Sequence, residues 1–474
     1  MKRLAAAGLI LLAPLASCRL RGPAPTRPIV VDLGPAWTDV PPLAREGLRM
    51  LMGDLAVTSG ATTFEPQTPG LSIQGRVEIQ LEGALLPGGL RLSAHLHAPG
   101  QPDQDIAPTA ADPGSQMVEI LAAAGLRSRN SPSILPRDPS RLLPLADLYG
   151  RARRGSDAEA ISAAQDAASF LRTDPGCAPA AYARGAGLYR GLLEPGPPDV
   201  EALAACHEAF DQALQLVPGY PRAAAFQARV CVDTGNQRLA FQTLLPAISR
   251  WPRALGLRPM LAYAARTSGL LGTALDAIRQ EQALRNDPLG DEILANNALL
   301  YAGEWDRFES SLSVGSDERP DPMREFYRGY IRLLRGNQAG AEAYFKKATA
   351  PTERDPDFQA LAAAYLAALD GHRAEGLLTL RRVAQSRQGL RIPDGEFTFK
   401  LAEAFAYLGD TEGAMNAAQL AFSQGFGCTP WYGRTPLLAP LHALPRWRAL
   451  ISHLQARQKL MEDQFASVGS RDGT

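Results

Sequence analysis

The sequence has no long apolar run at its N-terminus and no excess of either charge. The apolar run Leu4–Ala16 is shorter than the about 20 residues that a membrane-spanning helix needs. The chain has 49 basic and 49 acidic residues. A nucleic-acid-binding domain or a polybasic membrane-binding surface normally needs a basic excess. We therefore predict that the partners are proteins or neutral ligands and that nucleic acid is not among them.

Sequence motifs of common catalytic and metal sites are also missing. The phosphate-binding loop GxxxxGK[ST], the zinc-protease motif HExxH and the nucleophile motif GxSxG do not occur. His95 and His97 would share one side of a strand, but no third metal ligand lies near them in the sequence. We therefore predict that the protein is not an enzyme and holds no cofactor and no metal.

Cysteine is scarce, with five residues in 474. None forms a CxxC pair, and none has histidine at the spacing of a zinc finger. Cys206 and Cys231 are either small buried apolar side chains or a disulfide pair. The same disulfide question is open for Cys177 and Cys428.

The first 18 residues have the pattern of a secretory signal. Two basic residues, Lys2 and Arg3, precede the apolar run, which ends in Leu15-Ala16-Ser17-Cys18. This ending resembles the lipobox of bacterial lipoproteins, in which an aliphatic residue and two small residues precede a cysteine. The resemblance implies a signal peptide at residues 1–17, which is removed, and lipid on Cys18. The alternative is an ordinary signal peptide with an incidental cysteine.

Lipid on Cys18 would place the protein in the cell envelope. The Pro-rich segment 18–28 is predicted to be a tether. The residue after the cysteine is Arg19, whereas inner-membrane retention in many Gram-negative bacteria involves an Asp there. The resemblance therefore implies an outer-membrane lipoprotein that faces the periplasm and contacts the membrane through its lipid anchor only.

Residues 29–130 are predicted to form a small α/β domain. Ile29–Val31 is typical of a strand, and Pro42–Val57 has the apolar stripe of a helix. Polar and apolar residues alternate in 76–81 and again in 90–97, with a turn between them, which predicts a hairpin. A helix at about 116–124 follows. This order is similar in outline to the amino-terminal domain of the translocation protein TolB.

The second half of the chain contains a repeat with a period close to 34 residues. Its turn glycines are spaced by 34, 34, 33, 35 and 38 residues, and small or apolar residues recur at fixed distances from them. The glycines are Gly235, Gly269, Gly303, Gly336, Gly371 and Gly409. We predict that each ends one helix through a positive φ and is followed by a second, antiparallel helix.

This repeat resembles the tetratricopeptide repeat (TPR), with Leu401–Asp410 followed by Ala414 as its best match. Two weaker units precede it, which gives about eight helix pairs over residues 140–426. The predicted fold is therefore mainly α: a TPR-type α-solenoid preceded by a small α/β domain. Residues 427–466 resemble the C-terminal segment of bacterial regulatory proteins that join a TolB-like domain to TPRs, and we predict that they cap the array.

The TPR resemblance implies a concave groove lined by the first helix of each pair. One series of groove residues stands six positions before the turn glycines, and the geometry of the family adds three more. Exposed tyrosines in a groove are typical binding anchors; the alternative is that these side chains pack between repeats. The series is Arg229, Tyr263, Asn297, Tyr330, Tyr365 and Glu403, and the additions are Arg222, Phe326 and Phe399.

Together these features predict a membrane-anchored lipoprotein that acts as a scaffold or adaptor for proteins or peptides of the bacterial cell envelope. Two alternatives belong to other classes. One is a glycan-binding or accessory subunit of an envelope or export machine, and the other is a hydrolase with an unrecognised site.

Overall fold

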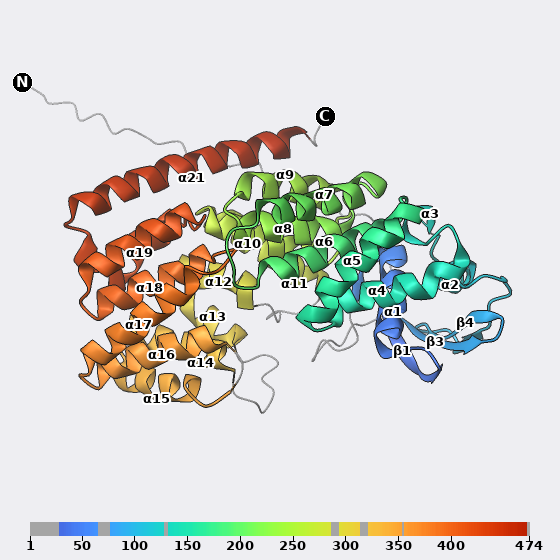
Figure 1. Cartoon of the computed structure of the whole chain (residues 1–474), viewed down its shortest axis with the longest axis horizontal. Helices are drawn as coiled ribbons and strands as arrows, with labels where there is room; N and C mark the ends of the chain where they lie inside the picture. Colours follow the sequence, from blue (N-terminus) through green and yellow to red (C-terminus); the bar gives the residue numbers. More distant parts are fainter. Residues whose placement is uncertain are drawn as a thin grey trace, which may run out of the picture.

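The computed structural model of the chain describes residues 28–64, 76–127, 131–285, 293–312, 321–352 and 355–471. The predicted signal peptide 1–17, Cys18 and the tether up to residue 27 lie outside these ranges. The fold is mainly helical, with a small sheet near the N-terminus (Figure 1). Among the helices in these ranges, none is long and apolar enough to cross a bilayer.

The N-terminal part is the predicted α/β domain. Its sheet has the order β2-β1-β3-β4-β5, with β1 parallel to β2 and β3 and with antiparallel pairs at β3–β4 and β4–β5. The first helix and the hairpin occur where the sequence predicts them, whereas the short strands β2 and β5 give no readable pattern. The elements are β1 (Ile29–Thr38), α1 (Pro42–Val57), β2 (Thr63–Phe64), β3 (Val77–Leu86), β4 (Gly89–His97), β5 (Gln104–Ile106) and α2 (Pro113–Ala123).

One face of this sheet is buried and the other is polar. Side chains of β3 and β4 alternate between buried and more exposed positions, as the sequence alternation predicts. Ile79 and Leu96 belong to the buried set, and helices α1 and α2 contact strands of the sheet. His95 and His97 are exposed, and their Nδ1 atoms contact carboxylates of Asp105 and Asp103.

Helices make up almost all of the rest. From α4 to α19 the described helices follow one another in eight successive pairs, and four short elements and one long helix flank them. The bounds are α3 (Ser131–Ile134), η1 (Pro139–Arg141), α4 (Leu142–Arg154), α5 (Asp157–Thr173), α6 (Ala178–Leu192), α7 (Val200–Leu216), α8 (Pro221–Asp233), α9 (Gln237–Arg250), α10 (Leu257–Thr267), α11 (Leu271–Arg285), α12 (Ile293–Ala302), α13 (Trp305–Ser311), α14 (Pro322–Leu334), α15 (Gln338–Ala348), α16 (Pro356–Leu369), α17 (Arg373–Arg387), α18 (Gly395–Tyr407), α19 (Thr411–Ser423), α20 (Thr429–Arg434), η2 (Pro436–Leu441) and α21 (Pro445–Arg471).

The six periodic glycines lie at the turns where the sequence predicts them. Each has a φ between 75° and 89° and lies one or two residues beyond the end of the first helix of a pair. A side chain is strained in this left-handed conformation, so glycine is favoured there. The glycine period therefore identifies the helix boundaries correctly.

The α/β domain shares one hydrophobic core with the first helix pairs. This core contains residues of β1, β3, β4, α1 and α2 together with residues of α4 to α8. Helix α1 crosses α4 at backbone distance: a Cβ atom on Gly47 would lie 1.8 Å from the carbonyl oxygen of Ala146, and one on Gly150 would lie 1.9 Å from that of Leu43. The α/β domain and the first helix pairs therefore do not have separate cores.

The helix pairs also close on themselves. Helix α10 lies beside α18, and the start of α9 lies beside the end of α19, although 130 and 188 residues separate the contacting side chains (Figure 1). The Gln237 side chain donates to the Gly425 carbonyl at 2.7 Å, and the Gly427 amide donates to the Thr267 carbonyl at 2.7 Å. Helix α21 runs across this contact and touches α9, α19 and α20. An open array, in which each repeat contacts only its neighbours, would lack these contacts.

The alanine positions of the repeat test how tightly the pairs are packed. Ala402 of α18 is fully buried in the C-terminal core. Ala402→Leu should lower the free energy of unfolding by about 1 to 3 kcal/mol, because added methyl groups overpack the core. Denaturant unfolding measures this, with Ala449→Leu on the exposed side of α21 as the control. Equal stability of the two variants would contradict the repeat register.

Candidate functional site

Most of the predicted groove residues are buried inside the protein. Phe326, Tyr330, Tyr365, Phe399 and Glu403 have no exposed surface, and Asn297 is 2% exposed. The expectation that these six side chains line an accessible groove is therefore wrong. They do face inward, as the repeat position predicts, but the chain itself fills the space that they face.

A buried ion pair lies where α10, α12 and α18 meet. Arg266 of α10 contacts Glu396 of α18 at 2.8 Å, and the Arg266 side chain has no exposed surface. Asn297 and Tyr301 of α12 donate to the same carboxylate at 3.0 and 2.5 Å. Burial alone would raise the pKa of Glu396, but the Arg266 charge and these hydrogen bonds lower it overall. The predicted groove residue Asn297 thus has an internal partner.

A second buried ion pair lies one turn further along α18. Lys400 contacts Glu403 at 2.9 Å, and both side chains are at most 1% exposed. Tyr330 of α14 donates to Glu403 at 2.7 Å, and the Thr435 hydroxyl donates to it at 2.7 Å. Thr435 belongs to the predicted capping segment, which folds inward here. The capping segment therefore covers the predicted groove at Tyr330 and Glu403.

Three predicted residues keep some exposure. Arg229 lies 3.6 Å from Asp233, and the Tyr263 hydroxyl donates to the same carboxylate at 2.6 Å. Both therefore have a partner within the chain. Arg222 of α8 is different, because its side chain borders a cavity and is 24% exposed.

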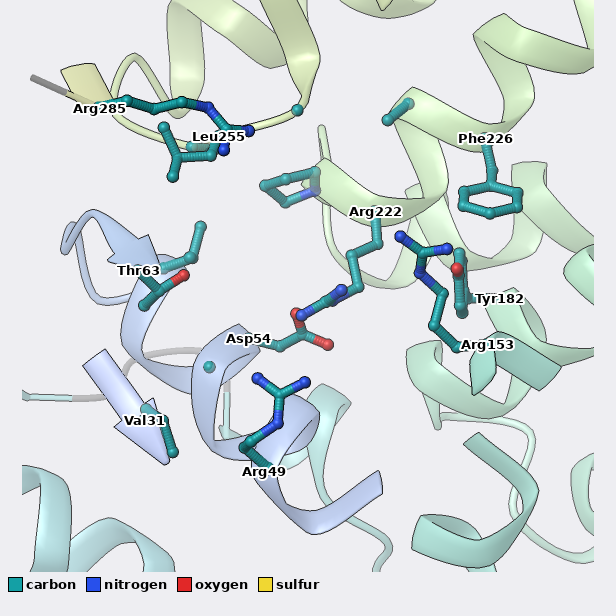
Figure 2. A pocket seen from close by; sticks show the side chains of 16 residues that line it. Val31, Arg49, Asp54, Thr63, Arg153, Tyr182, Arg222, Phe226, Leu255 and Arg285 are labelled. Carbon is teal, nitrogen blue, oxygen red and sulfur yellow. The ribbon is translucent and has the colours of Figure 1, made fainter. Parts of the chain in front are cut away.

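The cavity lies between the α/β domain and the helix pairs and has a volume of about 280 Å³. Its wall contains parts of β1 and α1 on one side and of α4, α6, α8 and α11 on the other. Figure 2 shows four arginine side chains from separate elements around one space. They are Arg49, Arg153, Arg222 and Arg285.

Among the described residues that line the cavity, only Asp54 on α1 has a carboxylate. Its Oδ1 accepts from Arg222 Nε at 2.6 Å, and its Oδ2 accepts from the hydroxyls of Tyr149 and Tyr220 at 2.5 Å each. The burial of the two tyrosines, together with the Asp54 charge, raises the pKa of both hydroxyls. Asp54 thus anchors Arg222 and ties α1 to α4 and α8.

Two of the other arginines pair with carboxylates that do not line the cavity. Arg49 is 2.9 Å from Glu46, and Arg285 is 3.0 Å from Glu281. These carboxylates do not belong to the lining of the cavity. Of the described residues, four guanidinium groups and one carboxylate therefore border the space.

Two groups on the cavity wall have unused hydrogen-bonding capacity. Arg153 of α4 has no hydrogen bond or ion pair with any described residue, and its guanidinium lies over the ring of Phe226 at 5.5 Å. The Tyr182 hydroxyl is fully buried and has no hydrogen-bond partner in the part of the chain that the structure describes. Figure 2 shows these two side chains next to each other. A buried hydroxyl without a partner is unfavourable and is commonly a sign of a function.

Of this site, the sequence prediction identifies only Arg222, and for a different reason. Arg49, Asp54, Arg153, Tyr182 and Arg285 are spread over half of the chain. No spacing pattern connects them, and the balanced net charge conceals their local excess of positive charge. Only the packing of α1 against α4 and α8 brings them together.

Neither the cysteines nor the possible metal ligands of the described residues form a second candidate site. Cys177, Cys206, Cys231 and Cys428 are buried free thiols, which agrees with the prediction of small buried side chains over that of a disulfide. Within the described ranges, no three His, Cys, Asp or Glu side chains are arranged to hold a metal ion.

Comparison with known proteins does not assign a function. No protein-family model matches the chain, and no curated protein is similar to it at a significant level.

Proposed function

We propose that this protein is a lipid-anchored adaptor of the bacterial cell envelope that binds its partner at the cavity between its α/β domain and its helix pairs. The helix pairs with their glycine turns are those of a TPR-like array, and the lipobox-like ending at Cys18 supplies the anchor on the outer membrane. A protein or peptide of the periplasm is the proposed partner.

The arginine-lined cavity is the observation that carries this proposal. Four cationic side chains from separate elements converge on it, and Tyr182 on its wall has a hydroxyl without a partner among the described residues. A binding site is typically a preformed cavity into which a small number of polar groups point. The predicted groove offers no such surface, because the chain fills it.

The anchor is tested by replacing the cysteine of the lipobox-like ending. Cys18→Ala should abolish labelling with a palmitate analogue and should move the protein out of the detergent phase. Cys177→Ala is the matched control, because Cys177 is a buried thiol and should not affect the label. Label that persists on the Cys18→Ala protein would place the lipid elsewhere.

The adaptor function is tested by capture from cross-linked envelopes. The wild-type protein should recover a defined set of proteins, and Arg153→Glu should recover less of them. Arg448→Glu on the exposed side of α21 is the control, because it makes the same charge change far from the cavity. Retention on peptidoglycan or polysaccharide alone would favour the glycan-binding alternative.

A further inference from the structure

We propose that the cavity recognises a phosphate monoester group, with Arg153 and the Tyr182 hydroxyl as direct ligands of the phosphate oxygens. This inference rests on the proposed function in one respect only, namely that the cavity is the binding site. It adds the chemistry of what is bound.

The charge of the cavity indicates an anion. Arg49, Arg222 and Arg285 each have a carboxylate partner, whereas Arg153 has none among the described residues. Arg222 donates to Asp54 through its Nε atom, and its two terminal nitrogens have no hydrogen bond to a described residue. A bound anion would compensate the charge of Arg153 and use these free donors.

The arrangement of the donors favours a phosphate over a carboxylate. A carboxylate has two oxygens in one plane, and one guanidinium fork can bind both of them at once. Here the guanidinium groups come from α1, α4, α8 and α11 and thus approach the space from different directions. A phosphate monoester has three terminal oxygens in a tetrahedral arrangement, so it can accept hydrogen bonds from several sides at once.

The unpaired hydroxyl of Tyr182 is the second observation that indicates a ligand. Its ring is held by Tyr149, Tyr220 and Phe226, which contact it edge-on at 5.4 to 6.4 Å between ring centroids. The ring cannot turn away to satisfy its hydroxyl elsewhere. Burial raises the pKa of this hydroxyl, and the positive charges of Arg153 and Arg222 act in the opposite direction. The two arginines and the hydroxyl would bind the same ligand.

The remainder of the ligand would contact apolar parts of the wall. Phe226 and Leu255 border the same space. The cavity volume of about 280 Å³ is several times the volume of about 30 Å³ that one molecule occupies in liquid water. It has room for a phosphate and a small attached group, which is either a free molecule or part of a partner protein.

A titration of the full chain in detergent tests the inference, with phenyl phosphate as the probe. Arg153→Gln should raise the Kd about tenfold or more, since a charge-assisted hydrogen bond is lost. Tyr182→Phe should raise it about fivefold, since a neutral hydrogen bond is lost. The control Arg448→Gln should bind like the wild type.

Tyr182→Phe also separates binding from folding. The substitution removes a hydroxyl that has no partner among the described residues, so the melting temperature without ligand should stay equal or rise. Weaker binding at unchanged stability supports a direct ligand. The inference is overturned if phenyl phosphate does not bind at millimolar concentration, if both cavity variants bind it like the wild type, or if citrate binds more tightly than phenyl phosphate.

The source of the phosphate is identified by competition. If phenyl phosphate displaces proteins captured from the envelope, the phosphate is carried by the partner; if it binds without displacing them, the ligand is a free small molecule. Both results support the inference. Failure of the wild-type protein to capture any defined protein would instead reject the adaptor function, while the titration would stand independently.

Discussion

Replacing Gly47 with alanine should destabilise the protein by more than about 3 kcal/mol, at or above the upper end of typical overpacking costs. The new Cβ atom would lie 1.8 Å from the carbonyl oxygen of Ala146, and a backbone atom moves aside at a greater cost than the end of a flexible side chain. Helices α1 and α4 would have to separate, and the shared core between the α/β domain and the helix pairs would open. Denaturant unfolding measures the change.

The control for this variant lies on the same helix. Gly53→Ala meets its nearest neighbour, a nitrogen of Arg222, at 3.9 Å, which is ordinary van der Waals contact. It should leave stability unchanged or raise it by up to about 1 kcal/mol, because alanine favours the helix. Similar destabilisation by both variants would show that the effect is not due to the helix crossing.

Glu396→Gln should cost about 3 to 5 kcal/mol, because it leaves the buried charge of Arg266 without a partner. Its control is Glu412→Gln at an exposed pair with Arg446, where the side chains are 71% and 46% exposed. Loss of an exposed pair costs at most about 1 kcal/mol. Equal effects of the two substitutions would mean that Arg266 reaches another acceptor or water.

The cost of Glu396→Gln should also depend on pH. The pKa of Glu396 is lower in the folded protein than the value of about 4.3 that an unperturbed glutamate has. A carboxylate with a lowered pKa contributes its stability above the unfolded pKa, and this contribution is lost as the pH falls through the folded pKa. The difference between the wild type and the variant should therefore shrink as the pH falls below about 4.

Local patterns in the sequence predict the elements of this fold well. Helix α1 has the bounds that its apolar stripe predicts, and the turn glycines mark the helix ends because one residue type satisfies one backbone requirement. Such features depend on neighbours within a few residues. They can be read from one sequence without any knowledge of the tertiary contacts.

The candidate site could not be predicted in this way. Whether Tyr330 faces water or Glu403 depends on Thr435 and the segment around it, about 100 residues further along the chain. The TPR resemblance gives the correct inward direction of these side chains but not the closure of the space. The arginine cavity depends in the same way on the crossing of α1 and α4, which no periodicity indicates.

Closure of the helix pairs has a consequence for how this protein unfolds. An open repeat array is quasi-one-dimensional, so its end repeats can fray and single repeats can be added or lost. Here the contacts of Gln237 with Gly425 and of Arg266 with Glu396 join segments 188 and 130 residues apart. Fraying from the C-terminus would break both contacts together with the covering helix α21. We therefore expect the array to unfold as a cooperative unit, and insertion of one additional helix pair between α10 and α18 would put the closing residues out of register.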